Sequence, residues 1–81
     1  SQLRVTRGVE AAVFMYQTSA QEYKVSLRSN GAVDVSAIAS YFGGGGHVKA
    51  AGCTLQGSSY DVINNLTLHI EKQLREKEIL S

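Results

Sequence analysis

Gly43, Gly44, Gly45 and Gly46 stand directly before His47, and Lys49 follows two residues later. Ordering each glycine backbone costs roughly 1–2 kcal/mol, so four of them in a row need a compensating gain. Consecutive glycines can turn several N–H groups toward one point, and such concavities bind anions. A helix that begins near His47 would add its positive end to the same place. These residue types therefore indicate a pocket for a phosphorylated ligand.

A flexible linker or a close packing contact would account for less of the glycine run. Linker glycines usually sit among serines and other polar residues, whereas Tyr41 and Phe42 come directly before this run. Close packing of a helix on a strand would require one or two of the glycines. Spacing excludes the P-loop, because Val48 and not glycine precedes Lys49. It also excludes the dinucleotide-binding motif, because Val48 or Lys49 stands where the last glycine of that motif is needed.

The composition indicates one globular domain with a modest core. The chain has 81 residues, of which 43% are hydrophobic and 19% charged, and its net charge of +1 argues against a dominant nucleic-acid-binding surface. Cys53 is the single cysteine, so no internal disulfide can form, which is compatible with a reducing cytoplasm. No apolar run is long enough to span a bilayer. We therefore expect a cytoplasmic protein without a membrane partner.

The first half of the chain predicts an antiparallel hairpin. Residues 10–17 are apolar, and residues 22–28 alternate strictly, so both segments favour strands. The alternation puts two sets of side chains on opposite faces: Tyr23, Val25 and Leu27 against Lys24, Ser26 and Arg28. Asn30-Gly31 then predicts a turn. Any of the four tyrosines could stack on a base, although core or core-edge positions are expected for them.

Helices and one further strand follow. Asp34 is a good N-cap for a helix that ends at the glycines, a second short helix is predicted over residues 47–51, and a strand over residues 53–56. Ser58 or Ser59 would cap a final helix. Its apolar stripe has four members: Ile63, Leu66, Ile70 and Leu74. The expected fold class is α+β, a small mixed sheet of about three or more strands with helices, in the order β-β-α-α-β-α.

The joined motif resembles a known family. "GGGGHVKAAG" is similar to the signature Gly-Gly-Gly-Gly-His-x-x-Ala-Ala-Gly of the DHHA1 domain, the C-terminal domain of many DHH-family phosphoesterases. The longer segment over residues 25–52 resembles the bacterial branch of oligoribonucleases and pAp phosphatases, the nanoRNases. The resemblance extends more weakly over most of the chain, so residues 1–81 are expected to be one DHHA1-like substrate-binding domain.

The resemblance implies a division of labour between two domains. In the family, the DHH domain holds a two-metal centre, usually manganese, which activates water to attack a phosphoester. This chain contains no Asp-His-His triplet, so the catalytic DHH domain is not expected within it. The chain should bind no cofactor itself and should be inactive alone, whereas the parent protein should be a hydrolase. Its expected partners are the DHH domain of the same parent chain and short RNA or nucleotide phosphates.

The same resemblance assigns substrate contacts to particular positions. Arg28 and Ser29 match the Arg-Ser pair that contacts substrate in the family, and His47 matches the histidine that faces the cleft. The four glycines match the loop that meets the nucleotide or its phosphate. We expect Arg28 to grip a terminal phosphate with two hydrogen bonds and His47 to donate to another oxygen. His69 and Cys53 are expected to be structural.

Two other functions stay open at this point. DHHA1-like domains also resemble the C-terminal domain of alanyl-tRNA synthetases and parts of single-strand exonucleases, where the module binds nucleic acid or associates chains. The final helix could instead serve a homodimer. The sequence leaves the preferred substrate open among short RNA, pAp and cyclic-dinucleotide products.

Overall fold

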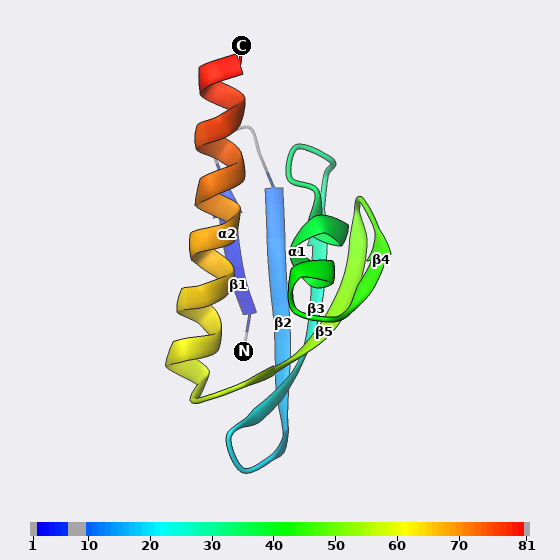
Figure 1. The fold of residues 1–81 in the computed structure, drawn as a ribbon, viewed down its shortest axis with the longest axis vertical. Coiled ribbons are helices and arrows are strands. Elements are labelled where there is room, and N and C mark those ends of the chain that lie inside the picture. Colours follow the sequence, from blue (N-terminus) through cyan, green and yellow to red (C-terminus); the bar gives the residue numbers. More distant parts are fainter. Residues whose placement is uncertain (1, 7–9, 81) are drawn as a thin grey trace.

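Seven elements make up the computed structural model, which describes residues 2–6 and 10–80 and the side chains of residues 11–77. In chain order they are β1 (Gln2–Thr6), β2 (Glu10–Ser19), β3 (Glu22–Ser29), α1 (Val35–Tyr41), β4 (Gly45–His47), β5 (Ala50–Gln56) and α2 (Ser59–Leu80) (Figure 1). No helix in this part of the chain is long and apolar enough to cross a membrane.

The strands form one five-stranded sheet in the order β1-β2-β3-β5-β4, and each pair of neighbours is antiparallel. The predicted hairpin of β2 and β3 is confirmed, with its turn at residues 20 and 21. The expected mixed sheet is wrong, since β3 and β5 also run antiparallel. The class α+β is confirmed.

The predicted helix over residues 47–51 is wrong. β4 and β5 form a tight hairpin there, with the turn at Val48 and Lys49, and Gly52 lies within β5 rather than at a helix end. The run Ala50-Ala51 favours a helix locally, but Ala51 is 7% exposed and packs into the core from the sheet. Burial of that strand face outweighs the weak helical preference.

The core lies between the sheet and the two helices, which pack on the same face. One set of alternate strand residues is buried with Val35, Ile38 and Ala39 of α1 and with Val62, Leu66 and Ile70 of α2. The strand members of this cluster are Val13, Met15, Val25, Leu27, Ala51, Cys53 and Leu55. The predicted apolar stripe of α2 is confirmed: Leu66 and Ile70 are buried, and Ile63 and Leu74 pack against the cluster as partly buried residues. Val62 is a further buried member that was not predicted from the sequence. None of the elements that the structure describes covers the other face of the sheet (Figure 1).

Both helices begin at the caps that the sequence predicts. The Ser58 hydroxyl accepts from the Asp61 amide, and Asp61 accepts from the Ser58 amide in return. The Asp34 carboxylate accepts from the amides of Ser36 and Ala37 at 3.0 and 3.2 Å. The Ser36 hydroxyl also donates a hydrogen bond to this carboxylate. Because these hydrogen bonds stabilise the charged form, the pKa of Asp34 lies below its ordinary value.

A side chain of α2 holds the start of α1 in place. The Asp34 amide donates to Oε1 of Gln73 at 2.8 Å, and Nε2 of Gln73 donates to the Asp34 carbonyl at 2.9 Å. The two hydrogen bonds satisfy both backbone groups of Asp34. They also join residues 39 positions apart in the sequence, so α1 takes its position from α2 as well as from the sheet.

We expect Asp34→Ala to lower the free energy of unfolding by about 1 kcal/mol at neutral pH, since an N-cap acceptor is lost. Because the folded-state pKa is lowered, the charge-dependent part of this stabilisation is present above the ordinary pKa of about 3.9 and is lost as the pH falls through the folded-state value. Urea denaturation at neutral pH and near pH 2 measures the difference. Asp34→Asn, which keeps an acceptor, is the matched control, and an equal deficit of the alanine variant at both pH values would contradict the assignment.

Candidate functional site

The uncovered face of the sheet carries the polar side chains of its central strands. In β3 it presents Lys24, Ser26 and Arg28, which alternate with the buried Val25 and Leu27. The predicted two-faced pattern of this strand is therefore confirmed. We call this surface the open face.

Arg28 and His47 lie in one cross-strand row of the open face. Ala50 of β5 is the register partner of Arg28 on one side and of His47 on the other. Paired residues of an antiparallel sheet share a face, so the two basic side chains stand on either side of a single methyl group. Two strand spacings separate their backbones by about 10 Å. Residues 19 positions apart in the sequence are thus brought together.

The Arg28 guanidinium is available to a ligand. The side chain is exposed, and Nη1 donates to the carbonyl of Leu27, its own neighbour in β3, at 3.2 Å. Arg28 makes no ion pair with any carboxylate in the described part of the chain. His47 is exposed at the end of β4. Two exposed groups that can donate hydrogen bonds therefore face the same space.

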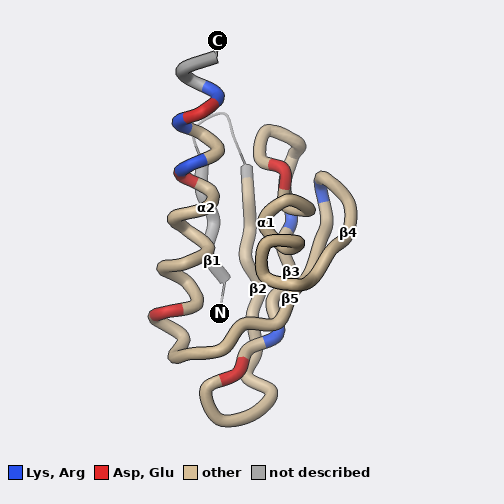
Figure 2. Tube along the Cα trace, in the orientation of Figure 1, with Lys and Arg blue, Asp and Glu red and all other residues tan. Residues whose placement is uncertain are grey.

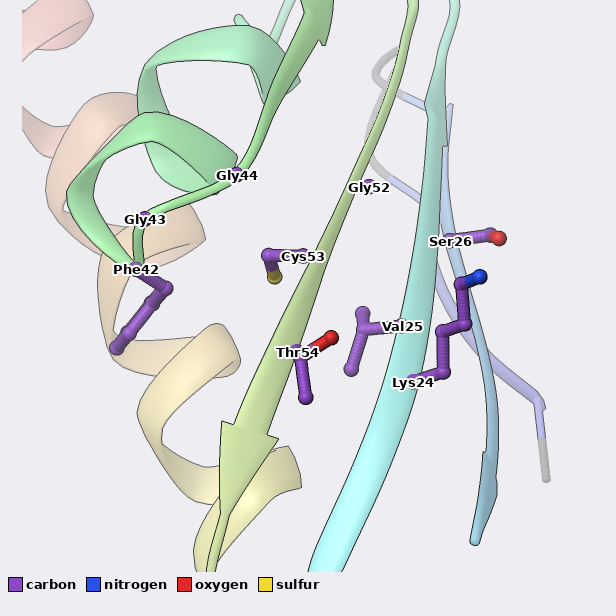
Figure 3. A pocket seen from close by; sticks show the side chains of 9 residues that line it. All are labelled: Lys24, Val25, Ser26, Phe42, Gly43, Gly44, Gly52, Cys53 and Thr54. Atoms are coloured by element: carbon purple, nitrogen blue, oxygen red, sulfur yellow. The ribbon is translucent and has the colours of Figure 1, made fainter. Parts of the chain in front are cut away.

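The next row of the open face lacks side chains at its β4 and β5 positions. Gly45 is paired with Gly52, and Gly52 is paired with Ser26. A pocket of about 330 Å³ opens at this point, at the lower end of the usual range for small-molecule sites. Its lining residues are Lys24, Val25, Ser26, Phe42, Gly43, Gly44, Gly52, Cys53 and Thr54 (Figure 3). The sequence missed Gly52 as a site residue because the segment was predicted as a helix.

Two of the four consecutive glycines are required by close packing on β5. A Cβ atom at Gly44 would overlap the Gly52 carbonyl oxygen, and one at Gly46 would lie 2.6 Å from the Ala50 carbonyl oxygen. Gly46 also has a φ of +147°, and Gly43 has a φ of +84°. Residues with a side chain rarely adopt such positive φ values. Packing and backbone conformation thus explain three of the four glycines: Gly43, Gly44 and Gly46. From the sequence, close packing was expected to require only one or two of them.

Gly45 is the glycine that the fold does not require. Its φ is not positive, and a Cβ atom there would meet nothing within 4 Å. It lies in the row next to Arg28 and His47, on the same face. The backbone of Gly45 is therefore open to contact by a molecule from outside the domain.

The converging N–H groups predicted for the glycine run are not formed at its first two residues. The amides of Gly43 and Gly44 donate to the carbonyls of Ser40 and Ala39, where they close the C-terminal end of α1. No helix begins at His47, so the positive helix end expected there is also missing. Of the donors expected at this place, the side chains of Arg28 and His47 remain exposed.

Ser29 is separated from Arg28 by the alternation of β3. Its register partner is the buried Ala11. The Ser29 hydroxyl accepts from the amides of Gly31 and Val33 at 3.0 and 3.3 Å, and the side chain of Asn30 accepts from the Ala32 amide. Both residues build the turn after β3, as the sequence predicted for Asn30. A substrate contact of Ser29 stays a prediction.

The remaining histidine and the aromatic residues lie elsewhere. His69 packs against the rings of Tyr41 and Phe42, with centroid distances of 4.5 and 5.0 Å, which fits the structural role expected for it. Tyr23 packs on the core, but the core or core-edge position expected for the other tyrosines is wrong: Tyr16, Tyr41 and Tyr60 are 59%, 73% and 78% exposed.

Cys53 and the acidic residues do not form a reactive centre. Cys53 is a buried free cysteine, and its burial raises the pKa of the thiol, which disfavours the nucleophilic thiolate. In the described ranges, no group of three His, Cys, Asp or Glu residues comes together to hold a metal ion. The side chains in these ranges therefore do not fit a metal centre.

We expect Gly44→Ala and Gly46→Ala to destabilise the fold by about 1–3 kcal/mol or more, because their methyl groups would overlap the backbone of β5. Gly45→Ala, with open space around its new methyl group, should unfold like the wild type. Thermal denaturation of the three variants measures this, with Gly45→Ala as the matched control. Equal melting temperatures for all three variants would contradict the role given to β5 packing.

Comparison with known proteins identifies the family. The family model of the DHHA1 domain matches residues 1–76. A protein of Thermus thermophilus, named bifunctional oligoribonuclease and PAP phosphatase NrnA, is 44% identical over 59 residues; the match covers 73% of this chain and 18% of the relative. The chain thus spans a small part of that protein's length. The resemblance seen in the glycine–histidine motif is confirmed, and the chain belongs to the DHHA1 domain family.

Proposed function

We propose that the chain is the substrate-binding domain of a DHH-family phosphoesterase that acts on short oligoribonucleotides or pAp. The observation that carries the proposal is the shared row of Arg28 and His47 on the open face. The relative's name describes an oligoribonuclease and PAP phosphatase, and the phosphate groups of such substrates match two neighbouring exposed donors.

The open face offers separate places to the parts of a nucleotide. Arg28 can bind a phosphate through two parallel hydrogen bonds, and His47 can donate to another oxygen from the far side of Ala50. The bare backbone of Gly45 and Gly52 lets a sugar or base come close to the sheet. The pocket beside them has Lys24 and Ser26 at its rim, so that polar edges of a base find partners there.

Hydrolysis is assigned to another part of the parent protein. The described residues bring together no metal-binding cluster, and the manganese expected for the family would belong to the DHH domain of the same parent chain. Within this division, the 81 residues hold and orient the nucleotide and do not cleave it. A cytoplasmic location, where Cys53 stays reduced, agrees with this function.

A general nucleic-acid-binding module is the alternative, and salt dependence separates the two. For single strands, the slope of log K against log salt concentration is about −0.7 per phosphate contact. One phosphate at Arg28 and one at a neighbouring donor give a slope of about −1.4. A much steeper slope with longer RNA would favour the alternative.

We expect Arg28→Ala and His47→Ala each to weaken the binding of pAp to the 81-residue chain by about tenfold or more, because a hydrogen bond to a charged group contributes about 1.5–3 kcal/mol. An amide NMR titration measures the dissociation constant and should show shifts around Arg28, Gly45 and His47. Arg75→Ala, an exposed arginine on α2, is the matched control. Unchanged affinity in both site variants would refute the assignment.

A further inference from the structure

Two exposed aromatic side chains follow one another on the open face, in β2. Phe14 is 43% exposed and Tyr16 is 59% exposed. Met15, which lies between them, is 6% exposed, and Val13, which precedes Phe14, is 2% exposed. Phe14 is not part of the buried cluster on the covered face, and 43% of its surface stays exposed. Burial in the core therefore does not explain why a phenylalanine occupies this position.

The register connects Phe14 to the site already described. Phe14 is paired with Ser26, Ser26 with Gly52, and Gly52 with Gly45, so one row leads from the glycine backbone to the phenylalanine. Arg28 lies two residues from Ser26 on the same strand and is therefore a diagonal neighbour of Phe14. The aromatic ring and the phosphate-binding arginine thus flank the same patch of sheet.

The pocket at Gly52 and the ring of Phe14 are too far apart along this row to hold the same base. β5 and β2 are two strand spacings apart, about 10 Å. One base cannot both fill the pocket at Gly52 and lie flat on Phe14. Only a ligand with a further nucleotide is long enough to extend from the pocket to the ring.

The charge of the surroundings suits a nucleic-acid strand. Lys24 and Arg28 lie on either side of Ser26 along β3, so a cation is near Phe14 toward both ends of the strand. Glu22 is the carboxylate among the described side chains of this face, and it lies at the first residue of β3, where it accepts hydrogen bonds from Thr18 and Gln56. Figure 2 shows basic positions along β3 and at the turn between β4 and β5. Aromatic stacking beside cations is the usual way to hold single strands without reading their sequence.

We propose that Phe14 is the stacking platform for the second base of a short single-stranded oligoribonucleotide, with Tyr16 continuing the platform toward the next base. This rests on the proposed function, since the phosphate held by Arg28 and His47 sets where the strand begins. Phe14 would thereby distinguish oligoribonucleotides from pAp, because it would increase the affinity for oligoribonucleotides and leave the affinity for pAp unchanged. The occupant of this sheet face is then RNA of two or more nucleotides.

The test compares pAp with the trinucleotide pApApA on the 81-residue chain. We expect Phe14→Ala to weaken trinucleotide binding by about tenfold or more, the effect of losing one base–aromatic contact, and to leave pAp binding unchanged. Tyr60→Ala, which removes an exposed aromatic from α2, should change neither. The unchanged pAp affinity also shows that the Phe14→Ala chain is folded.

Tryptophan substitution gives a direct optical readout. The chain contains no tryptophan, so Phe14→Trp introduces a single tryptophan at the proposed platform, which can be excited apart from the tyrosines. Its emission should be quenched by pApApA and not by pAp, and its trinucleotide affinity should match or exceed that of the wild type. Tyr60→Trp is the matched control and should respond to neither ligand.

The outcomes separate this proposal from the one on which it rests. If Phe14→Ala leaves trinucleotide affinity unchanged, or weakens both ligands equally, the platform is refuted while phosphate binding at Arg28 stands. If the wild type binds the trinucleotide no tighter than pAp, the second base has no site, and the platform is again refuted. If pAp affinity responds neither to Arg28→Ala nor to His47→Ala, the proposed function itself fails.

Discussion

The contact between the glycine segment and β5 is the constraint on which the candidate site depends. Gly44 and Gly46 lie so close to the β5 backbone that neither could carry a side chain. This approach lets β4 pair with β5 in the register that sets His47 opposite Ala50, and thereby in the same row as Arg28. Two of the glycines thus act by bringing a histidine to its place, whereas the open space around Gly45 is not required by the fold.

The two faces of the sheet separate the core that stabilises the fold from the proposed binding site. The covered face holds the apolar cluster with α1 and α2, and the open face carries the basic residues, the bare glycine row and two exposed aromatics. Such a division makes substitutions on the open face cheap for the fold, because they remove little buried surface. A surface of this kind can change its ligand preference without loss of the core.

Much of the fold follows from local patterns in the sequence. The alternation in residues 22–28 predicts β3 and its two faces. Asp34 and Ser58 predict where the two helices begin, and the spacing of apolar residues predicts α2. The helix expected over residues 47–51 failed because Ala50 and Ala51 carry no strand signal of their own; pairing with β3 decides their conformation. The roles of Arg28 and His47 were predicted from the family motif, but their shared row could not be, since it depends on the register of three strands. Phe14 lay inside an apolar run that predicts burial, and only the sheet shows which face it occupies.

The hydrogen bonds between Gln73 and Asp34 have a consequence for how the domain opens. They tie α2 to the start of α1, while the amides of Gly43 and Gly44 tie the end of α1 to the segment that leads into β4. The segment leading into β4, α1 and the turn of α2 around Gln73 therefore form one continuous chain of contacts through the domain. Segments linked in this way tend to unfold locally as one cooperative unit. A ligand on the open face would then hold together a helix pair that it never touches.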